Sequence, residues 1–328
     1  MPRVSVIILT WNGRPYLGEC LNSLAGQTFR DFETILVDNG SADGSAAFVR
    51  SQFPWVRLLE LPENAGFAEG NNRGLALAQG TYIVTLNNDT KVAPAFLAEL
   101  VRVADADLRI GMVAAKMRNY CRPEQIDAAG LKVAFNGLGY NIGFGETDQG
   151  QHDSAPLFGP CGGAALYRRA MLEEIGFFDA DFFAYYEDFD LAWRARLAGW
   201  KAVAAARALV YHVHSATGGE MSPFKVYHTH RNKWFVIVKN WPGPLLRRHL
   251  AALVFTDLAA FCLALLRGRG RAALRARLDA VRSLGTLLRK RAGIQAARAL
   301  SDAQAAALFS PREPLFRTFL RKMGLKRQ

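Results

Sequence analysis

Four short apolar runs, rich in β-branched residues and separated by helical patterns, constrain the fold of this chain more than any other feature. The runs cover residues 4–10, 34–38, 56–61 and 82–86. Continuous runs of this kind are typical of parallel strands buried on both faces. The segments with helical periodicity are 16–25, 45–52, 70–78 and 94–103. Strands that alternate with helices predict an α/β fold, a doubly wound and mostly parallel sheet of the Rossmann-like kind.

Polar side chains follow three of these strands at their carboxyl ends. They are Thr10 and Asn12 after the first strand, Asp38 after the second, and Asn87, Asn88 and Asp89 after the fourth. Ligands of doubly wound sheets bind at the carboxyl ends of the strands. The sequence therefore predicts a single site at this edge.

The later part of the chain is predicted to complete this domain and add a helical appendage. Residues 118–158 are rich in Gly and Asn and indicate an irregular insertion or lid. Helices are expected at 168–175 and 187–199, and a strand at 208–214. We place the catalytic domain at 1–241 and a basic, amphipathic helical region at 242–328. Its first helix, 245–266, is strongly apolar, and its second, 271–298, is rich in arginine.

The positive charge lies in this C-terminal region. The chain has 328 residues and a formal net charge of +12. From Trp241 onward there are 18 Lys and Arg against 4 Asp and Glu, so the first 240 residues sum to −2. The cations alternate with apolar residues, without the aromatic platforms of a nucleic-acid binder, so the pattern favours an anionic membrane surface as partner over nucleic acid.

The polar residues at the strand ends admit a functional and a structural interpretation. Asp38 could accept hydrogen bonds from a nucleoside or simply cap the following turn. The triplet Asn87, Asn88 and Asp89 offers oxygen ligands that suit Mg²⁺ or Mn²⁺, although Asn-rich turns without a ligand are common. The sequence alone leaves both alternatives open.

Two further groups could take part in chemistry. Glu187 and Asp188 begin a helix after an aromatic stretch, where apolar surroundings could raise a carboxyl pKa toward that of a general base; acidic residues are also ordinary at helix N-termini. His212 and His214 alternate along the expected strand, and either could complete a metal site.

Five motifs, in this order, resemble the inverting nucleotide-sugar glycosyltransferases of family 2, whose fold is called GT-A. The similarity is closest to bacterial rhamnosyltransferase-like members. The motifs are Val-Ser-Val-Ile-Ile-Leu-Thr-Trp-Asn at 4–12, Val-Asp-Asn-Gly-Ser at 37–41, Asn-Ala-Gly-Phe-Ala at 64–68 leading to Asn71, Leu-Asn-Asn-Asp at 86–89, and Glu-Asp-Phe-Asp-Leu-Ala-Trp-Arg at 187–194.

The resemblance implies a role for each motif. The residues expected to bind the donor are Thr10, Asn12, Asp38, Asn71, Asn87, Asn88, Gly162 and Gly163. Asp89 and His212, with His214 as the alternative, would hold the divalent metal, Mg²⁺ or Mn²⁺. Asp188, grouped with its neighbour Glu187 as catalytic, would take the proton from the acceptor hydroxyl as this attacks the anomeric carbon opposite the diphosphate.

Two departures from the family pattern refine this expectation. Many relatives have Asp at both ends of the metal triplet, whereas Asn87 stands at the first position here. The Gln-x-x-Arg-Trp motif of processive synthases is absent, since residues 229–234 read Thr-His-Arg-Asn-Lys-Trp. We therefore expect transfer of a single sugar.

The resemblance implies dTDP-rhamnose or a similar nucleotide sugar as donor. The acceptor would be a saccharide or lipid-linked saccharide of a bacterial cell-surface polysaccharide or glycolipid. A nucleotidyltransferase is the first alternative, but it would usually have a Gly-rich basic loop after the first strand. A non-catalytic sugar-nucleotide-binding module is the second, and it predicts loss of acidic residues that are in fact present.

The segment 250–266 approaches the length of a membrane span, but Asp257 interrupts it and arginines flank it. An interfacial helix that contacts anionic lipid is the favoured interpretation, and a helical hairpin packed on the catalytic domain is the alternative. The four dispersed cysteines indicate a reducing compartment. We expect a peripheral protein in the cytoplasm, at the inner face of the cytoplasmic membrane.

Overall fold

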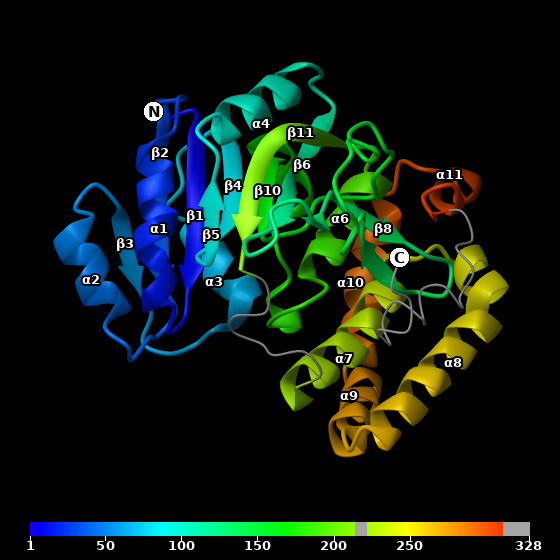
Figure 1. Cartoon of the computed structure of the whole chain (residues 1–328). Helices are drawn as coiled ribbons and strands as arrows, with labels where there is room; N and C mark the ends of the chain where they lie inside the picture. The colour runs from blue at the N-terminus through cyan, green and yellow to red at the C-terminus, as the bar shows by residue number, and fades with distance from the viewer. Residues whose placement is uncertain (214–221, 311–328) are drawn as a thin grey trace.

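The computed structural model describes residues 1–213 and 222–310, and within them a mostly parallel sheet forms the centre of the molecule (Figure 1). The strand order is β3-β2-β1-β4-β10-β6-β11-β5, with β7 paired to β6, and a separate small sheet joins β8 and β9. The strands are β1 (Val4–Thr10), β2 (Phe32–Asp38), β3 (Arg57–Glu60), β4 (Tyr82–Asn87), β5 (Thr90–Val92), β6 (Ile110–Asn119), β7 (Ile126–Ala128), β8 (Leu131–Val133), β9 (Gly139–Asn141), β10 (Ala164–Arg168) and β11 (Lys201–His212).

The register of the first strands brings their polar ends together. Strand β1 pairs in parallel with β2 and with β4, so that Thr10 lies opposite Asp38, and Leu9 lies opposite Asn87. The carboxyl ends of these three strands therefore meet at one edge of the sheet. The predicted α/β fold and its sheet are confirmed.

Helices cover both faces because successive residues of a strand point to opposite sides. Ile7 of β1 packs into the core that includes Ala68 of α3 and Trp193 of α6. Ile8 packs into the core that includes Leu17 of α1 and Leu97 of α4. The helices are α1 (Arg14–Ala25), α2 (Ser45–Gln52), α3 (Gly66–Leu75), α4 (Phe96–Asp105), α5 (Arg169–Ile175), the short 3-10 helix η1 (Ala180–Phe182), α6 (Glu187–Leu197), α7 (Pro223–Asn240), α8 (Gly243–Leu266), α9 (Gly270–Arg282), α10 (Leu284–Ala296) and α11 (Asp302–Ala306).

The structure corrects several sequence-based expectations. The insertion 118–158 contains β7, β8 and β9, which at three residues each are too short to give a periodic signal. The strand expected at 208–214 begins already at Lys201, and position 214 lies outside the described residues. The single helix expected at 271–298 is two helices that meet at Ser283.

The C-terminal helices pack against the sheet domain through α7, which the sequence analysis did not predict. Trp241, at the end of α7, packs with tilted ring planes against Trp193 of α6 and Phe309 near the end of the described chain. Backbone amides of Ala299 and Leu300 donate to the carbonyl of Leu197. In Figure 1, α9 and α10 run beside α7 while α8 lies at the outer side. The boundary at 241/242 stays a prediction.

Candidate active site

The loops after β1 and β4 meet through Thr10 and Asn88. The Asn88 side-chain amide donates to the Thr10 hydroxyl at 2.9 Å. A Cβ on Gly13 would lie 1.8 Å from the same amide nitrogen, so this close approach requires glycine. The structure thus joins two of the predicted donor-binding residues directly.

Asn12 joins the loops after β1 and β2. Its backbone has a φ of +51°, a left-handed conformation that asparagine tolerates better than most residues. Its backbone amide donates to the Ser41 hydroxyl at 2.9 Å, and its side-chain oxygen accepts from the backbone amide of Ala42 at 2.8 Å. Asp38 is 4% exposed and accepts from the amide of Ser41 at 3.2 Å, so it shapes this turn. This bond corresponds to the turn-capping role of Asp38 that the sequence left open, and it uses one carboxylate oxygen.

Asn39, a residue that the sequence analysis missed as a site residue, connects this edge to α3. Its side-chain nitrogen donates to the side-chain oxygen of Asn64 at 2.9 Å, and its side-chain oxygen accepts from the backbone amide of Ala65 at 2.9 Å. Asn71 is buried within α3 and donates to the carbonyl of Phe67 at 2.8 Å. That bond turns the Asn71 amide nitrogen toward its own helix.

Asp89 and His212 form a pair at the end of β11. Because β5 pairs with the end of β11, His212 lies opposite Thr90, the residue after Asp89. His212 Nε2 is 3.3 Å from Asp89 Oδ1 and 3.4 Å from the Asn87 amide nitrogen. The structure therefore brings together three of the predicted site residues.

Asp127 on β7 holds the other side of the His212 ring. Its carboxylate is 2.7 Å from His212 Nδ1 and only 4% exposed. A carboxylate on the distal nitrogen is the usual support of a metal-binding histidine, because it fixes the ring and its tautomer. No local motif surrounds Asp127, so the sequence analysis missed it.

The residues present fit a divalent cation. Burial alone would lower the pKa of His212, but the hydrogen bonds and charges of Asp127 and Asp89 outweigh it and raise this pKa to about 9. One carboxylate and one imidazole suit Mn²⁺ or Mg²⁺ when diphosphate oxygens complete the coordination shell. The described part of the chain contains no group of three or more His, Cys, Asp and Glu side chains arranged to hold a metal ion.

Gly162 and Gly163, just before β10, lie between this pair and Asp188. The Gly162 amide donates to Asp188 Oδ2 at 3.1 Å, and its carbonyl accepts from the Thr85 hydroxyl at 2.7 Å. A Cβ on Gly163 would lie 2.9 Å from the Asn87 side-chain nitrogen. The two glycines thus let β4 and the start of α6 approach each other.

Glu187 and Asp188 begin α6 but differ in their exposure. Glu187 is 6% exposed, and its Oε2 has no hydrogen-bond partner among the described residues. Burial and the nearby charge of Asp188 raise the pKa of Glu187 well above its usual value. Asp188 is only partly buried, and burial raises its pKa to about 6 although two backbone amides stabilise the ionised form. Asp188 is therefore the member of the pair that an incoming molecule can reach.

The segment that leads into Asp188 is strained and held from α7. Phe183, Tyr185 and Tyr186 have φ values of +63°, +67° and +70°, a conformation that costs bulky residues energy. Asn232 of α7 donates from its side-chain nitrogen to the carbonyls of Phe182, Ala184 and Tyr185, at 2.9, 2.9 and 2.7 Å. The sequence analysis gave Asn232 no role, because nothing local distinguishes it.

The comparisons with known proteins agree with this geometry. The family model described as Glycosyl transferase family 2 matches residues 5–176, more than half of the chain. The chain belongs to this family. It is a glycosyltransferase, and the predicted GT-A fold agrees with its structural neighbours.

Among curated proteins, it is similar to an N-acetylglucosaminyl-diphospho-decaprenol L-rhamnosyltransferase from Mycobacterium tuberculosis. The two are 25% identical over 268 residues, which cover 73% of this chain and 87% of the relative. Among solved structures, the mannosyltransferase PcManGT from Pyrobaculum calidifontis in complex with GDP-Man and Mn²⁺ has a TM-score of 0.55, with 22% identity over 90% of this chain and 86% of that one. S. aureus TarS 1-349 in complex with UDP has a TM-score of 0.56, with 20% identity over 99% and 92%. These two structures support the fold.

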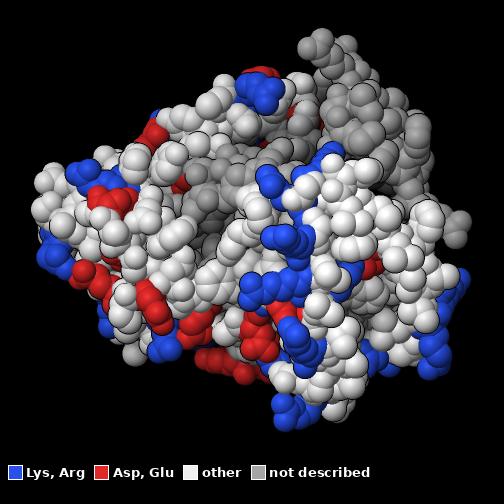
Figure 2. Space-filling model, turned by 90° about the horizontal axis from the view of Figure 1, so that it is seen from below, with Lys and Arg blue, Asp and Glu red and all other residues white. Residues whose placement is uncertain are grey.

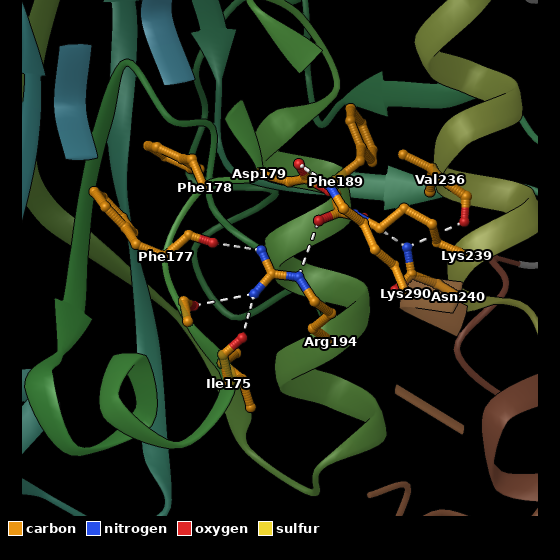
Figure 3. Close-up of polar contacts among 12 residues, drawn as sticks. Ile175, Phe177, Phe178, Asp179, Phe189, Arg194, Val236, Lys239, Asn240 and Lys290 are labelled. Atoms are coloured by element: carbon orange, nitrogen blue, oxygen red, sulfur yellow. Dashed lines mark hydrogen bonds and ion pairs between the residues drawn. The ribbon is translucent and has the colours of Figure 1, made fainter. Parts of the chain in front are cut away.

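In this glycosyltransferase, a buried ionic cluster anchors α6 to α7 (Figure 3). Asp190, fully buried, is 2.9 Å from Arg194 Nε and 2.8 Å from Lys239 Nζ, and accepts from the Asn240 amide at 2.8 Å. Arg194 also donates to the backbone carbonyls of residues 175–177. Burial would raise the pKa of Asp190, but the two cations lower it below its usual value. The cluster fixes the helix that begins with Glu187 and Asp188.

Proposed function

We propose that this glycosyltransferase moves one sugar from a nucleoside-diphosphate donor to an acceptor hydroxyl with inversion at the anomeric carbon. Asp188 is the general base. It takes the proton from the acceptor hydroxyl while the hydroxyl oxygen forms a bond to the anomeric carbon, and the bond from that carbon to the diphosphate oxygen breaks. The diphosphate leaves with the electron pair, and a single in-line displacement inverts the configuration.

The observation that carries this proposal is the environment of Asp188. The residue is partly exposed, burial raises the pKa of its carboxyl group to about 6, and the Gly162 amide orients the carboxylate. The same pair of glycines borders Asn87, so the base lies next to the strand end whose polar residues we assign to the donor. Glu187 is buried, so we assign the proton transfer to Asp188 alone.

Asp89 and His212 hold the divalent metal in this proposal, and Asp127 orients the imidazole. When bound, Mg²⁺ or Mn²⁺ neutralises charge on the departing nucleoside diphosphate. Thr10, Asn12 and Asp38 bind the nucleoside, while Asn71, Asn87, Asn88, Gly162 and Gly163 line the sugar-diphosphate region. The solved neighbour with GDP-Man and Mn²⁺ supports the choice of donor class and metal.

The named relatives suggest the substrates. The name of the Mycobacterium tuberculosis relative specifies an L-rhamnosyltransferase that acts on N-acetylglucosaminyl-diphospho-decaprenol. We propose dTDP-rhamnose or a related donor and a saccharide or lipid-linked saccharide acceptor in cell-surface polysaccharide or glycolipid synthesis. The enzyme would act in the cytoplasm, at the inner face of the membrane.

The test is release of nucleoside diphosphate from a panel of nucleotide sugars, with and without Mn²⁺ or Mg²⁺. We expect metal-dependent release from one donor, with loss of release in Asp89→Ala and Asp188→Asn. Glu173→Gln, which changes an exposed carboxylate on α5, is the matched control and should behave as wild type. Release of pyrophosphate from a nucleoside triphosphate would instead identify a nucleotidyltransferase. Donor binding without turnover, even with membrane-extracted acceptors, would identify a non-catalytic module.

A further inference from the structure

The outward face of α8 is apolar from Leu250 to the end of the helix at Leu266. Helix α8 has 24 residues, and it is the one helix in the described part of the chain that is long and apolar enough to cross a membrane. Only 17% of its most apolar 18-residue stretch is buried. Its large exposed side chains are Leu250, Val254, Phe255, Leu258, Leu265 and Leu266. Exposed apolar patches of this extent mark interaction surfaces rather than ordinary solvent-facing helices.

The inward face of α8 carries its only acidic residue. Asp257 is 2.8 Å from Lys233 Nζ of α7 and 2.8 Å from Arg277 Nε of α9, and it accepts from the Trp234 indole at 2.9 Å. Arg277 also donates to the Asp257 backbone carbonyl at 2.8 Å. A surface helix in water normally shows the opposite arrangement, with its charges outside and its apolar residues inside.

The Asp257 contacts determine how α8 can meet a bilayer. If α8 crossed the membrane, Asp257, Lys233 and Arg277 would have to enter the hydrocarbon or separate from one another, and either is costly. If α8 lies in the plane of the membrane surface, these contacts stay intact while the opposite face enters the lipid. The geometry therefore favours an in-plane helix over a spanning one.

Arginines lie at both ends of the apolar face. Arg247 and Arg248 are exposed in the first turns of α8, and Arg267 and Arg271 are exposed just beyond its end. Figure 2 shows a band of Lys and Arg beside an uncharged surface on this underside of the molecule. Anionic headgroups attract such cations, while the acyl boundary accepts the apolar side chains between them.

The same charges argue against a second copy of the chain as the partner. Two α8 helices that pack face to face, whether parallel or antiparallel, bring one arginine-bearing end beside another. Like charges in contact oppose this pairing, whereas anionic lipid neutralises both ends.

We propose that the exposed face of α8 docks in the plane of an anionic membrane, with Asp257 as the internal clamp that keeps the helix on the protein. Leu278 of α9 and Leu288 of α10 are exposed as well. Docking would bring the active site to a lipid-linked acceptor, and only this purpose rests on the proposed function. Membrane binding itself needs neither donor nor acceptor, so the two proposals can fail separately.

Co-sedimentation of the full chain with lipid vesicles tests the proposal. We expect the protein to pellet with phosphatidylcholine vesicles that contain phosphatidylglycerol and much less with phosphatidylcholine alone, and high salt should weaken the binding. The double variant Phe255→Ser and Leu258→Ser should bind at least about tenfold more weakly, because two large apolar side chains are lost. The control Leu108→Ser removes a side chain of similar size that is 79% exposed on the sheet domain, and it should bind as wild type.

Three outcomes would overturn the proposal. The first is no binding of the wild type to anionic vesicles. The second is equal binding by the α8 double variant, which would place the contact elsewhere. The third is resistance of the cellular protein to extraction with alkaline carbonate, which releases peripheral proteins but not spanning ones. A concentration-dependent dimer that the double variant abolishes, without vesicle binding by the wild type, would assign the face to a second copy.

Discussion

At the scale of single residues, the surroundings of Asp188 decide its chemistry. Ordinary aspartates ionise near pH 4, and the enclosed position at the start of α6 raises this pKa to about 6. A base with such a pKa binds a proton more strongly than an exposed aspartate and is still ionised at neutral pH. The sequence predicted this role from an acidic helix start and from the resemblance, but not the difference in exposure between Asp188 and Glu187.

We expect the pH profile of transfer to report Asp188. The base works only when deprotonated, so kcat/KM should fall as the pH drops below about 6. Asp188→Asn should lower kcat by about 10²–10⁴-fold, the usual contribution of general base catalysis. Its affinity for nucleoside diphosphate, measured by calorimetry, should stay within error of wild type. A large loss of nucleotide affinity would instead make Asp188 a donor-binding residue.

Asp127 should control how protons compete with the metal at His212. A metal needs the neutral imidazole, so Mn²⁺ affinity should rise as the pH increases toward about 9. In Asp127→Asn the pKa of His212 falls, and this rise should move to lower pH. At pH 9, where proton competition is small, the His212 ring of Asp127→Asn still lacks the carboxylate that orients it. This loss should weaken Mn²⁺ binding by about 10–100-fold.

Calorimetric titration with Mn²⁺ at saturating nucleoside diphosphate measures both effects. Glu124→Gln, an exposed carboxylate just before β7, is the control and should leave the titration unchanged. Identical pH dependence in Asp127→Asn and wild type would contradict the assignment of His212 as a ligand.

At the scale of elements, α7 holds the strained approach to α6. The sequence of α7 combines aromatic, β-branched and basic residues that pack on more than one side, so it lacks the apolar stripe by which helices are recognised. The side chain of Asn232 nevertheless satisfies three backbone carbonyls in a segment with three left-handed residues. One side chain thus connects a helix near the C-terminal region to the position of Asp188.

Replacing Asn232 should affect turnover more than donor binding. Asn232→Ala removes the side-chain donor of the Ala184 and Tyr185 carbonyls, which should lower the free energy of unfolding by about 1–3 kcal/mol, while the Phe182 carbonyl still accepts from Arg231 at 3.0 Å. A small displacement of Asp188 should lower kcat by up to about 100-fold. The nucleotide affinity should stay unchanged, because the residues that we assign to the nucleoside lie at the ends of β1 and β2.

Thr229→Ala is the matched control for Asn232, since its hydroxyl donates within α7 to the carbonyl of Lys225. It should retain wild-type kcat. If Asn232→Ala and Thr229→Ala lowered kcat equally, a general loss of α7 stability would explain the result, and a positioning role for Asn232 would not stand.

At the scale of the whole molecule, buried ion pairs join the C-terminal helices to the sheet domain. Lys239 of α7 pairs with Asp190 of α6 and with Asp179, and Lys290 of α10 is 2.6 Å from Asp179. These charges lie far apart in the sequence, and only packing reveals that they form one cluster. Removal of one of these charges should therefore lower the stability of the protein and displace α6.

Lys239→Met should strongly destabilise the protein. Removing the cation leaves buried carboxylates with incomplete compensation, which costs about 3–5 kcal/mol. Lys201→Met is the control, because its partner Asp107 forms a largely exposed pair that contributes at most about 1 kcal/mol. Denaturant unfolding monitored by tryptophan fluorescence measures both variants. Equal, small losses would mean that Lys239 contributes no more than a surface cation.

The same cluster predicts acid sensitivity. The pKa values of Asp179 and Asp190 lie below those of the unfolded chain, despite burial, because of their cations. The folded state therefore binds fewer protons, so this stabilisation is complete above about pH 4 and is lost as the pH falls further. Lys239→Met should lose less stability than wild type over the same acid range, as followed by unfolding curves at a series of pH values.

The sequence by itself determined the sheet, its polar edge and the order of the family motifs. Buried strands and their helices leave periodic, local patterns, and Thr10, Asp38 and Asn87 stand where those patterns end. Only the tertiary structure decided which distant side chains support the site. Asp127 and Asn232 act through partners 85 and about 50 residues away, and the outward face of α8 depends on where Asp257 finds its cations. Such contacts arise from packing between elements, and packing leaves no local signature in a single sequence.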